Sequence, residues 1–311
     1  MTFVPLKDLR GSRAEPVSAP PLQRLPSWFK VQAKTGPDYL DIKQTMERLK
    51  LHTICEEARC PNVWECWNAR TATFLILGDI CTRRCHYCSV TTGRPMELDR
   101  GEPLRVAQAV QALGLRHAVI TSVNRDELED GGAAMFAETI RQTRRLSPDC
   151  TIEVLIPDFE GNEAALATVA MAKPDILNHN IETVRRLFPA IRPQGKYQRS
   201  IEVLRQAKEL GMKTKSGLIL GMGETMDEAR GVMRDLRAVA CDIMTIGQYL
   251  QPTKDHLPVA RFYDPSEFAR LKEEGMALGF THVESGPLVR SSYHAEQQVD
   301  SNPNGIAFPS H

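Results

Sequence analysis

The sequence predicts an α/β fold with a parallel sheet, built as an open, partial (β/α)6 barrel with extensions at both ends. From about residue 71, short apolar strands alternate with amphipathic helices, which is typical of parallel strands joined by helical crossovers. The six β–α units of this pattern are too few for a closed barrel of about eight. We therefore expect the functional side chains in the loops that follow the C-terminal ends of the strands.

The strands and helices are predicted from their apolar periodicity. Strands are predicted at Thr73–Leu77, Ala118–Thr121, Ile152–Ile156, Asp175–Asn178, Lys213–Leu220 and Asp242–Ile246. Apolar residues at steps of three and four predict helices at Tyr39–Leu49, Leu104–Leu113, Ala133–Leu146, Glu163–Ala172, Arg199–Leu210 and Thr225–Val239. A last helix, Pro265–Leu278, has Asp264 as its N-cap and Gly279 as its stop.

The composition excludes several classes of protein. The 311 residues include 39 Lys and Arg against 39 Asp and Glu, which argues against a nucleic-acid binder that depends on overall positive charge. Since no apolar run approaches the ~20 residues that cross a bilayer, we expect no membrane segment. The first 30 residues lack the apolar region of a secretory signal, so a cytoplasmic protein is expected.

The chain is divided into three segments. Residues 1–70 are predicted to be an N-terminal extension, in which 1–37 form an extended arm with Trp28 and Phe29 as anchors. Residues 71–284 form the partial barrel, and residues 285–311 form a C-terminal segment. Six of the eight cysteines lie within 34 residues, which in a non-secreted chain favours metal binding over disulfides. Cys150 and Cys241, beside predicted strands, are interpreted as small buried apolar residues.

Cys81, Cys85 and Cys88 follow the first predicted strand with the spacing C-x3-C-x2-C. Three thiolates can bind a cubane iron–sulfur cluster and leave one iron open to an outside ligand. The alternative is a structural zinc that takes His86 or a distant residue as its fourth ligand. With Tyr87 before the last cysteine, this run resembles the signature of the radical S-adenosylmethionine (SAM) enzymes. The resemblance implies that the open iron binds SAM, whose reductive cleavage gives a radical that no side chain can supply.

Other segments resemble the SAM-binding parts of the same superfamily. The run from Gly217 through Gly221 to Glu224 is similar to a G-x-I-x-G-x-x-E segment. The resemblance suggests Ser122 and Asp126 for the SAM amino group and Asn180 for its ribose or carboxylate. The alternatives are a glycine-rich turn with Glu224 as a helix charge, and an ordinary solvated loop at residues 121–132.

Cys55, Cys60 and Cys66 form a second trio whose spacing, C-x4-C-x5-C, fits neither zinc fingers nor common ferredoxins. Since the first site already has three cysteines, this trio predicts a second cluster. Trp64 and Trp67 flank it, and we expect them to shield it from water. The alternative is that these cysteines are free, or bind zinc with a histidine such as His52.

Three runs taken together resemble the lipoyl synthases over residues 40 to about 296: the second trio, Cys81-Thr-Arg-Arg-Cys85 and Arg290-Ser-Ser-Tyr-His294. Glu129, where proline is expected, and Tyr87, where phenylalanine is frequent, are small departures. The resemblance implies that the second [4Fe–4S] cluster is held by its three cysteines and Ser292 and is consumed as the sulfur donor. The sequence alone does not choose between Ser291 and Ser292.

The resemblance also implies an activity: insertion of two sulfur atoms at C6 and C8 of an octanoyl chain that is amide-linked to a lysine. The implied partners are the lipoyl domains of 2-oxoacid dehydrogenase complexes and the glycine-cleavage H protein, with ferredoxin or flavodoxin as electron donor. The rivals are a biotin-synthase-like enzyme acting on a free small molecule and a non-enzymatic zinc or iron–sulfur protein. A basic group is interpreted either as a docking face or as ordinary solvated surface: Arg185, Arg186, Arg192, Lys196 and Arg199.

Overall fold

The computed structural model of the protein describes residues 24–31 and 34–298. Residues up to Lys30 belong to one unit and those from Val31 onward to another, and each is described by itself. In the first unit, Ser27–Phe29 form a single 3-10 turn, η1, in which Phe29 is buried and Trp28 is exposed. Most of the predicted N-terminal arm and the end of the C-terminal segment lie outside the described residues.

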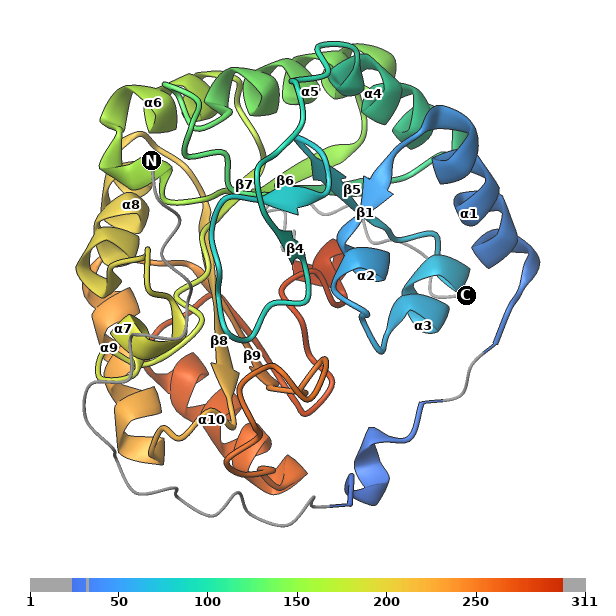
Figure 1. The fold of residues 1–311 in the computed structure, drawn as a ribbon. Helices are drawn as coiled ribbons and strands as arrows, with labels where there is room; N and C mark the ends of the chain where they lie inside the picture. Colours follow the sequence, from blue (N-terminus) through green and yellow to red (C-terminus); the bar gives the residue numbers. More distant parts are fainter. Residues whose placement is uncertain (1–23, 32–33, 299–311) are drawn as a thin grey trace, which may run out of the picture. The chain divides into compact units, whose positions relative to one another are not determined.

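The second unit is organised around one sheet with the strand order β1-β2-β5-β6-β7-β8-β9-β10 (Figure 1). The strands are β1 (His52–Thr53), β2 (Thr73–Ile76), β5 (His117–Ser122), β6 (Thr151–Leu155), β7 (Ile176–Asn178), β8 (Thr214–Leu220), β9 (Ile243–Gln248) and β10 (His282–Ser285). Every neighbouring pair from β2 onward is parallel, and β1 pairs antiparallel with β2. All six predicted strands and the open sheet are confirmed.

The longer helices cover the outer side of this sheet (Figure 1). They are α1 (Pro37–Leu49), α4 (Glu102–Ala112), α5 (Ala133–Leu146), α6 (Glu163–Met171), α8 (Tyr197–Glu209), α9 (Met226–Ala238) and α10 (Pro265–Ala277). The short helices α2 (Ile54–Glu57) and α3 (Val63–Asn68) lie within the curve of the sheet (Figure 1), and α7 (Phe188–Ile191) lies in the connection between β7 and α8. Thr225 and Asp264 close capping boxes at the starts of α9 and α10, which satisfies otherwise unpaired backbone N–H groups there. No helix of the described residues is long and apolar enough to cross a membrane.

The two faces of the strands differ in chemistry. On β6, Ile152 and Val154 belong to the apolar core, whereas Glu153 between them points to the opposite face. There its carboxylate pairs with the ammonium group of Lys215 on β8 at 2.9 Å, and both side chains are completely buried. The barrel interior therefore contains a buried ion pair, while Ile152 and Val154 of the same strand belong to the apolar core on the other face of the sheet. Cys150 and Cys241 are buried as predicted.

The segment after β10 returns to the barrel and contacts the N-terminal extension. The backbone N–H of Gln248 on β9 donates to the carbonyl of Pro287 at 3.3 Å. The side-chain amide of Asn62, just before α3, donates to the carbonyl of Leu288 at 2.7 Å. The hydroxyl of Tyr293 donates to the Glu65 carboxylate on α3 at 3.1 Å. Residues 286–293 thus connect the last strands to the segment that carries the second cysteine trio. The last described residues form a 3-10 turn, η3 (Ala295–Gln298).

Candidate active site

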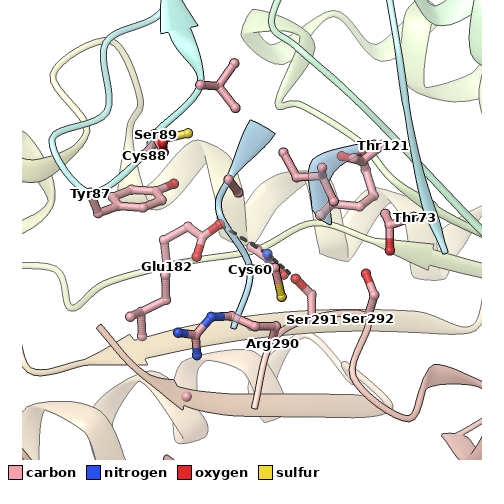
Figure 2. Close-up of a pocket in the computed structure, with 18 of the residues that line it drawn as sticks. Cys60, Thr73, Tyr87, Cys88, Ser89, Thr121, Glu182, Arg290, Ser291 and Ser292 are labelled. Carbon is pink, nitrogen blue, oxygen red and sulfur yellow. Dashed lines mark hydrogen bonds between the residues drawn. The ribbon is translucent and has the colours of Figure 1, made fainter. Parts of the chain in front are cut away.

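A cavity of about 470 Å³ opens at the C-terminal ends of β2, β5, β6, β7, β8 and β9, where the fold class places active sites. All six clustered cysteines line it: Cys55, Cys60, Cys66, Cys81, Cys85 and Cys88. Figure 2 shows Cys60 of the N-terminal extension, Cys88 of the loop after β2 and Ser292 of the C-terminal segment around this space. Three segments that are distant in sequence therefore contribute to one site.

The first cysteine trio lies in the loop that begins with the short strand β3 (Ile80–Cys81), which pairs with β4 (Thr91–Thr92). The Cys81 sulfur accepts the backbone N–H of Asn124, after β5, at 3.3 Å. The backbone N–H of Cys88 donates to the carbonyl of Cys85 at 3.1 Å, which closes a tight turn. On the other side, the imidazole of His256 lies 3.0 Å from the Cys88 carbonyl. The loop is therefore held by the segment that follows β5 and by the segment that follows β9.

The second cysteine trio is built on two short helices. Cys55 lies on α2, whose N-terminus is capped by Thr53, and the backbone N–H of Cys60 donates to the Cys55 carbonyl at 2.9 Å. Cys66 lies on α3. Trp64 and Trp67 also lie on α3, where Trp67 is completely buried and Trp64 is partly buried. The ring of Tyr39, on α1, stacks on Trp64 with 4.9 Å between the ring centroids. These aromatic rings cover α3 from the side of α1.

Five of the six clustered thiols have a raised pKa and so hold their protons strongly. Removal from water raises the pKa of Cys55 and Cys88 to about 12, and it also raises that of Cys60 and Cys85. Within each trio the neighbouring sulfur charges add to this effect, as Cys55 and Cys60 do for Cys66. Such thiols become anionic when a cation replaces their protons. The donor set therefore fits an iron–sulfur centre at each trio.

The two adjacent serines of the C-terminal segment have different surroundings. The Ser291 hydroxyl accepts a hydrogen bond from the Asn180 amide at 2.9 Å, and the same amide donates to Glu182 at 3.1 Å (Figure 2). Both serines line the cavity. Within the described part of the chain, the Ser292 hydroxyl has no such hydrogen bond. Ser291 is thus engaged with the barrel, and Ser292 is available.

The cavity wall also contains buried polar atoms that have no hydrogen-bond partner among the residues 24–31 and 34–298. They are Ser122 Oγ, Asn124 Oδ1, Asn180 Oδ1, Arg83 Nη1 and Arg192 Nε. Buried polar atoms are normally paired, so this group of donors and acceptors fits a polar ligand. The amino-acid and ribose groups of a molecule such as SAM carry hydrogen-bond donors and acceptors that complement these unpaired atoms.

Comparisons with known proteins agree with this geometry. Residues 75–236 match the radical SAM superfamily, and residues 13–60 match the N-terminal domain of lipoyl synthase of that family. The lipoyl synthase of Rubrobacter xylanophilus is 62% identical, over 97% of this chain and 92% of the relative. That of Shouchella clausii is 59% identical, over 89% of this chain and 91% of the relative.

The chain belongs to the lipoyl synthase family.

Solved structures share the fold of this family member at low sequence identity. The FeFe-hydrogenase maturase HydG from Carboxydothermus hydrogenoformans superposes with a TM-score of 0.54 at 14% identity, covering 84% of this chain and 77% of that chain. Methylornithine synthase gives a TM-score of 0.52 at 17% identity, covering 67% and 62%. These likenesses show the radical SAM partial barrel that the sequence predicted. Membership of the superfamily implies SAM and a [4Fe–4S] cluster.

In this lipoyl synthase family member, four of the six residues predicted for SAM line the cavity: Tyr87, Ser122, Asn180 and Gly217. The structure does not bring Asp126 or Gly221 to it. The Asp126 carboxylate is instead paired with Arg83, and Gly221 is covered by Gln248 and the carbonyl of Arg261. A loop position places a side chain near a site, but it does not determine the direction in which the side chain points.

Sequence analysis missed several residues of the cavity wall, among them Asn124, His179 and Glu182. Glu182 follows Asn180 by two residues, so that short run already contained the signal. Burial raises the pKa of the Glu182 carboxyl, which lies near Arg192. Arg192, assigned by sequence to a basic surface group, is buried in the cavity wall and donates to the Asn180 carbonyl at 3.0 Å.

The rest of that basic group is mostly neutralised within the chain. Arg185 pairs with Asp235 at 3.2 Å, Arg186 with Glu228 at 2.7 Å and Arg199 with Asp158 at 3.2 Å. Arg185 and Arg186 are exposed, as the solvated-surface interpretation expects. A docking face of unpaired positive charge at these residues is not supported, because Arg185, Arg186 and Arg199 each have an acidic neighbour and only Lys196 of the four is without an ion pair among the described residues.

Proposed function

We propose that this chain inserts sulfur at C6 and C8 of an octanoyl group that is amide-linked to a lysine of a lipoyl carrier domain. Cys81, Cys85 and Cys88 would hold the [4Fe–4S] cluster that binds SAM. The cysteines of the second trio and Ser292 would hold a second cluster. One observation carries the proposal: both trios and Ser292 line a single cavity. Membership of the lipoyl synthase family supports the reaction type.

When bound, SAM and the clusters supply hydrogen-abstracting radical chemistry and sulfide, which amino-acid side chains cannot provide. The protein's own part is to position the reactants. The unpaired polar atoms of Ser122, Asn124 and Asn180 orient the polar cofactor. The cavity also has apolar lining residues, including Leu75, Leu155 and Ile219, that suit an extended acyl chain and exclude water from it.

The C-terminal segment supplies the distinctive ligand. Oxygen is a harder ligand than thiolate and matches an iron–sulfide centre less well, so of the four ligands Ser292 would be the one most readily given up. The Arg290 guanidinium lies near Cys60 and counteracts the effect of burial on the pKa of that thiol. Arg290 therefore favours the thiolate form of Cys60 that a cluster requires. His294 lies 3.5 Å from Glu65, so it helps to attach the segment to α3.

The proposed partners follow from this activity. The substrates would be octanoylated lipoyl domains of 2-oxoacid dehydrogenase complexes and the glycine-cleavage H protein. Reduced ferredoxin or flavodoxin would supply electrons. The proposed location is the cytoplasm.

The proposal is tested with anaerobically reconstituted protein, SAM, a reductant and an octanoylated lipoyl domain. We expect mass spectrometry to show the gain of two sulfur atoms on the domain. Cys60→Ala should cleave SAM without inserting sulfur, and Cys85→Ala should do neither. Sulfur insertion into free dethiobiotin but not into the domain would support the biotin-synthase-like rival. A colourless, zinc-loaded protein without SAM cleavage would support the non-enzymatic rival.

A further inference from the structure

Arg83 occupies the middle of the first cysteine loop, between Cys81 and Cys85, yet its side chain does not face solvent. Only 3% of it is exposed. The next residue, Arg84, is exposed. Two arginines in the same three-residue interval of the loop therefore have opposite environments, and the buried one requires a partner for its charge.

The partners of Arg83 are carboxylates from two different strand ends. Its Nε lies 2.8 Å from Asp126 Oδ2 and its Nη2 lies 2.8 Å from Asp126 Oδ1, which is a two-point contact. The same Nη2 lies 2.7 Å from Asp158 Oδ1, and Asp158 is 1% exposed. Asp126 follows β5 and Asp158 follows β6. The planar guanidinium fork holds both carboxylates in one arrangement that an ammonium group does not reproduce.

The surrounding backbone supports this connection. Thr82, next to Arg83, donates from its hydroxyl to Asp126 Oδ2 at 3.1 Å and from its backbone N–H to the Asn124 carbonyl at 3.0 Å. After Asp158, Phe159 and Glu160 have φ values of +43° and +53°, which residues other than glycine rarely adopt. Such strain persists where the neighbouring contacts determine the conformation, and it is frequent at functional sites.

We propose that Arg83 is a positioning residue that fixes the first cysteine loop against the ends of β5 and β6. It thereby sets the distance between the three cysteines and the cavity groups at the C-terminal end of β5, Ser122 and Asn124. This inference rests on the proposed roles of the cysteines and of these two residues in binding SAM. It also assigns to Asp126 a role in the loop rather than a contact with SAM.

The test compares Arg83→Lys with Arg84→Lys, its exposed neighbour in the same loop, in anaerobically reconstituted protein. Arg83→Lys keeps the positive charge and loses the fork. We expect it to retain the parent's iron content. SAM changes the electron paramagnetic resonance spectrum of the reduced cluster, and the SAM concentration that gives half of this change should rise about 10-fold or more in Arg83→Lys. Arg84→Lys should match the parent in both measurements.

Asp126→Asn gives a second measurement that leaves Arg83 paired with Asp158. Asp126→Asn should also raise the SAM concentration that gives half of the spectral change. In the double variant with Arg83→Lys this concentration should be no higher than in the more affected single variant, because the two residues act together. The inference is overturned when both single variants bind SAM as the parent does. A parent protein that shows no SAM-dependent spectral change contradicts the proposed function itself, whatever the variants do.

Discussion

The carbonyl oxygen of Val289 lies so close to the α-carbon of Gly247 on β9 that a Cβ at position 247 would collide with it. Val289 precedes Arg290, Ser291 and Ser292. The absence of a side chain at residue 247 is therefore what allows the C-terminal segment to approach the barrel. The proposed serine ligand depends on a glycine more than forty residues before it.

We predict that Gly247→Ala displaces the C-terminal segment and lowers sulfur insertion about 10-fold or more, because it moves Ser292 from its place in the cavity. SAM cleavage should change far less, since the atoms nearest to a Cβ at residue 247 belong to Val289 and Arg290 and not to the first cysteine loop. Product mass and 5′-deoxyadenosine are measured in the same reactions. Gly231→Ala on α9, where a Cβ meets only the tip of Arg234, is the control and should behave as the parent. Equal activity in both variants would contradict the argument.

The two serines should respond differently to substitution. Ser292→Cys replaces the oxygen ligand by a sulfur that iron–sulfide centres bind more firmly. It should keep two clusters and cleave SAM, yet insert little sulfur. Ser291→Ala removes only the acceptor of the Asn180 amide, a loss of about 1 kcal/mol, and should retain most of the insertion. Iron content and product mass decide the matter, and full activity of Ser292→Cys would contradict the argument for a labile oxygen.

The buried pair of Glu153 and Lys215 predicts a large effect on stability. Lys215→Met removes the ammonium partner of the buried Glu153 carboxylate, which among the described residues keeps only the Asn178 amide and the neighbouring His117, and should lower the free energy of unfolding by about 3–5 kcal/mol, measured in denaturant. The double variant with Glu153→Gln should recover part of this loss. Lys272→Met, which breaks the half-exposed pair with Glu284, is the control and should cost at most about 1 kcal/mol. A loss of similar size in both single variants would contradict the interpretation.

The same pair sets a pH dependence. Burial alone would raise the pKa of Glu153, but the charges of Lys215 and His117 hold it at about 2. A carboxyl whose pKa is lower in the folded state stabilises the fold above its unfolded value of 4.5, and this contribution disappears as the pH falls toward 2. Without Lys215, the pKa of Glu153 rises and the carboxyl takes up a proton at higher pH. The stability difference between parent and Lys215→Met should therefore be largest near neutral pH and shrink in acid.

Most of the fold could be predicted from the sequence, because the helices and strands follow from local patterns of apolar residues. The helix expected at Ala133–Leu146 is α5 with the same bounds, because its apolar stripe is continuous. The sequence analysis missed β10, in which only Val283 is buried, because such a strand has no apolar alternation to detect. The cysteine trios were recognisable since their spacing is short. The directions in which the side chains of Asp126 and Arg192 point could not be predicted, because they depend on contacts with residues far away in the chain.

The two cysteine trios should be separable by substitution, because different long-range hydrogen bonds hold them. Asn62→Ala removes the bond from the second trio's segment to the Leu288 carbonyl. It should lose about half of the parent's iron and most sulfur insertion, while SAM cleavage continues. His256→Ala removes the contact with the Cys88 carbonyl and should impair SAM cleavage first. Iron analysis and 5′-deoxyadenosine formation distinguish the two patterns. Loss of SAM cleavage in Asn62→Ala, or loss of insertion with SAM cleavage intact in His256→Ala, would contradict the separate roles proposed for the two trios.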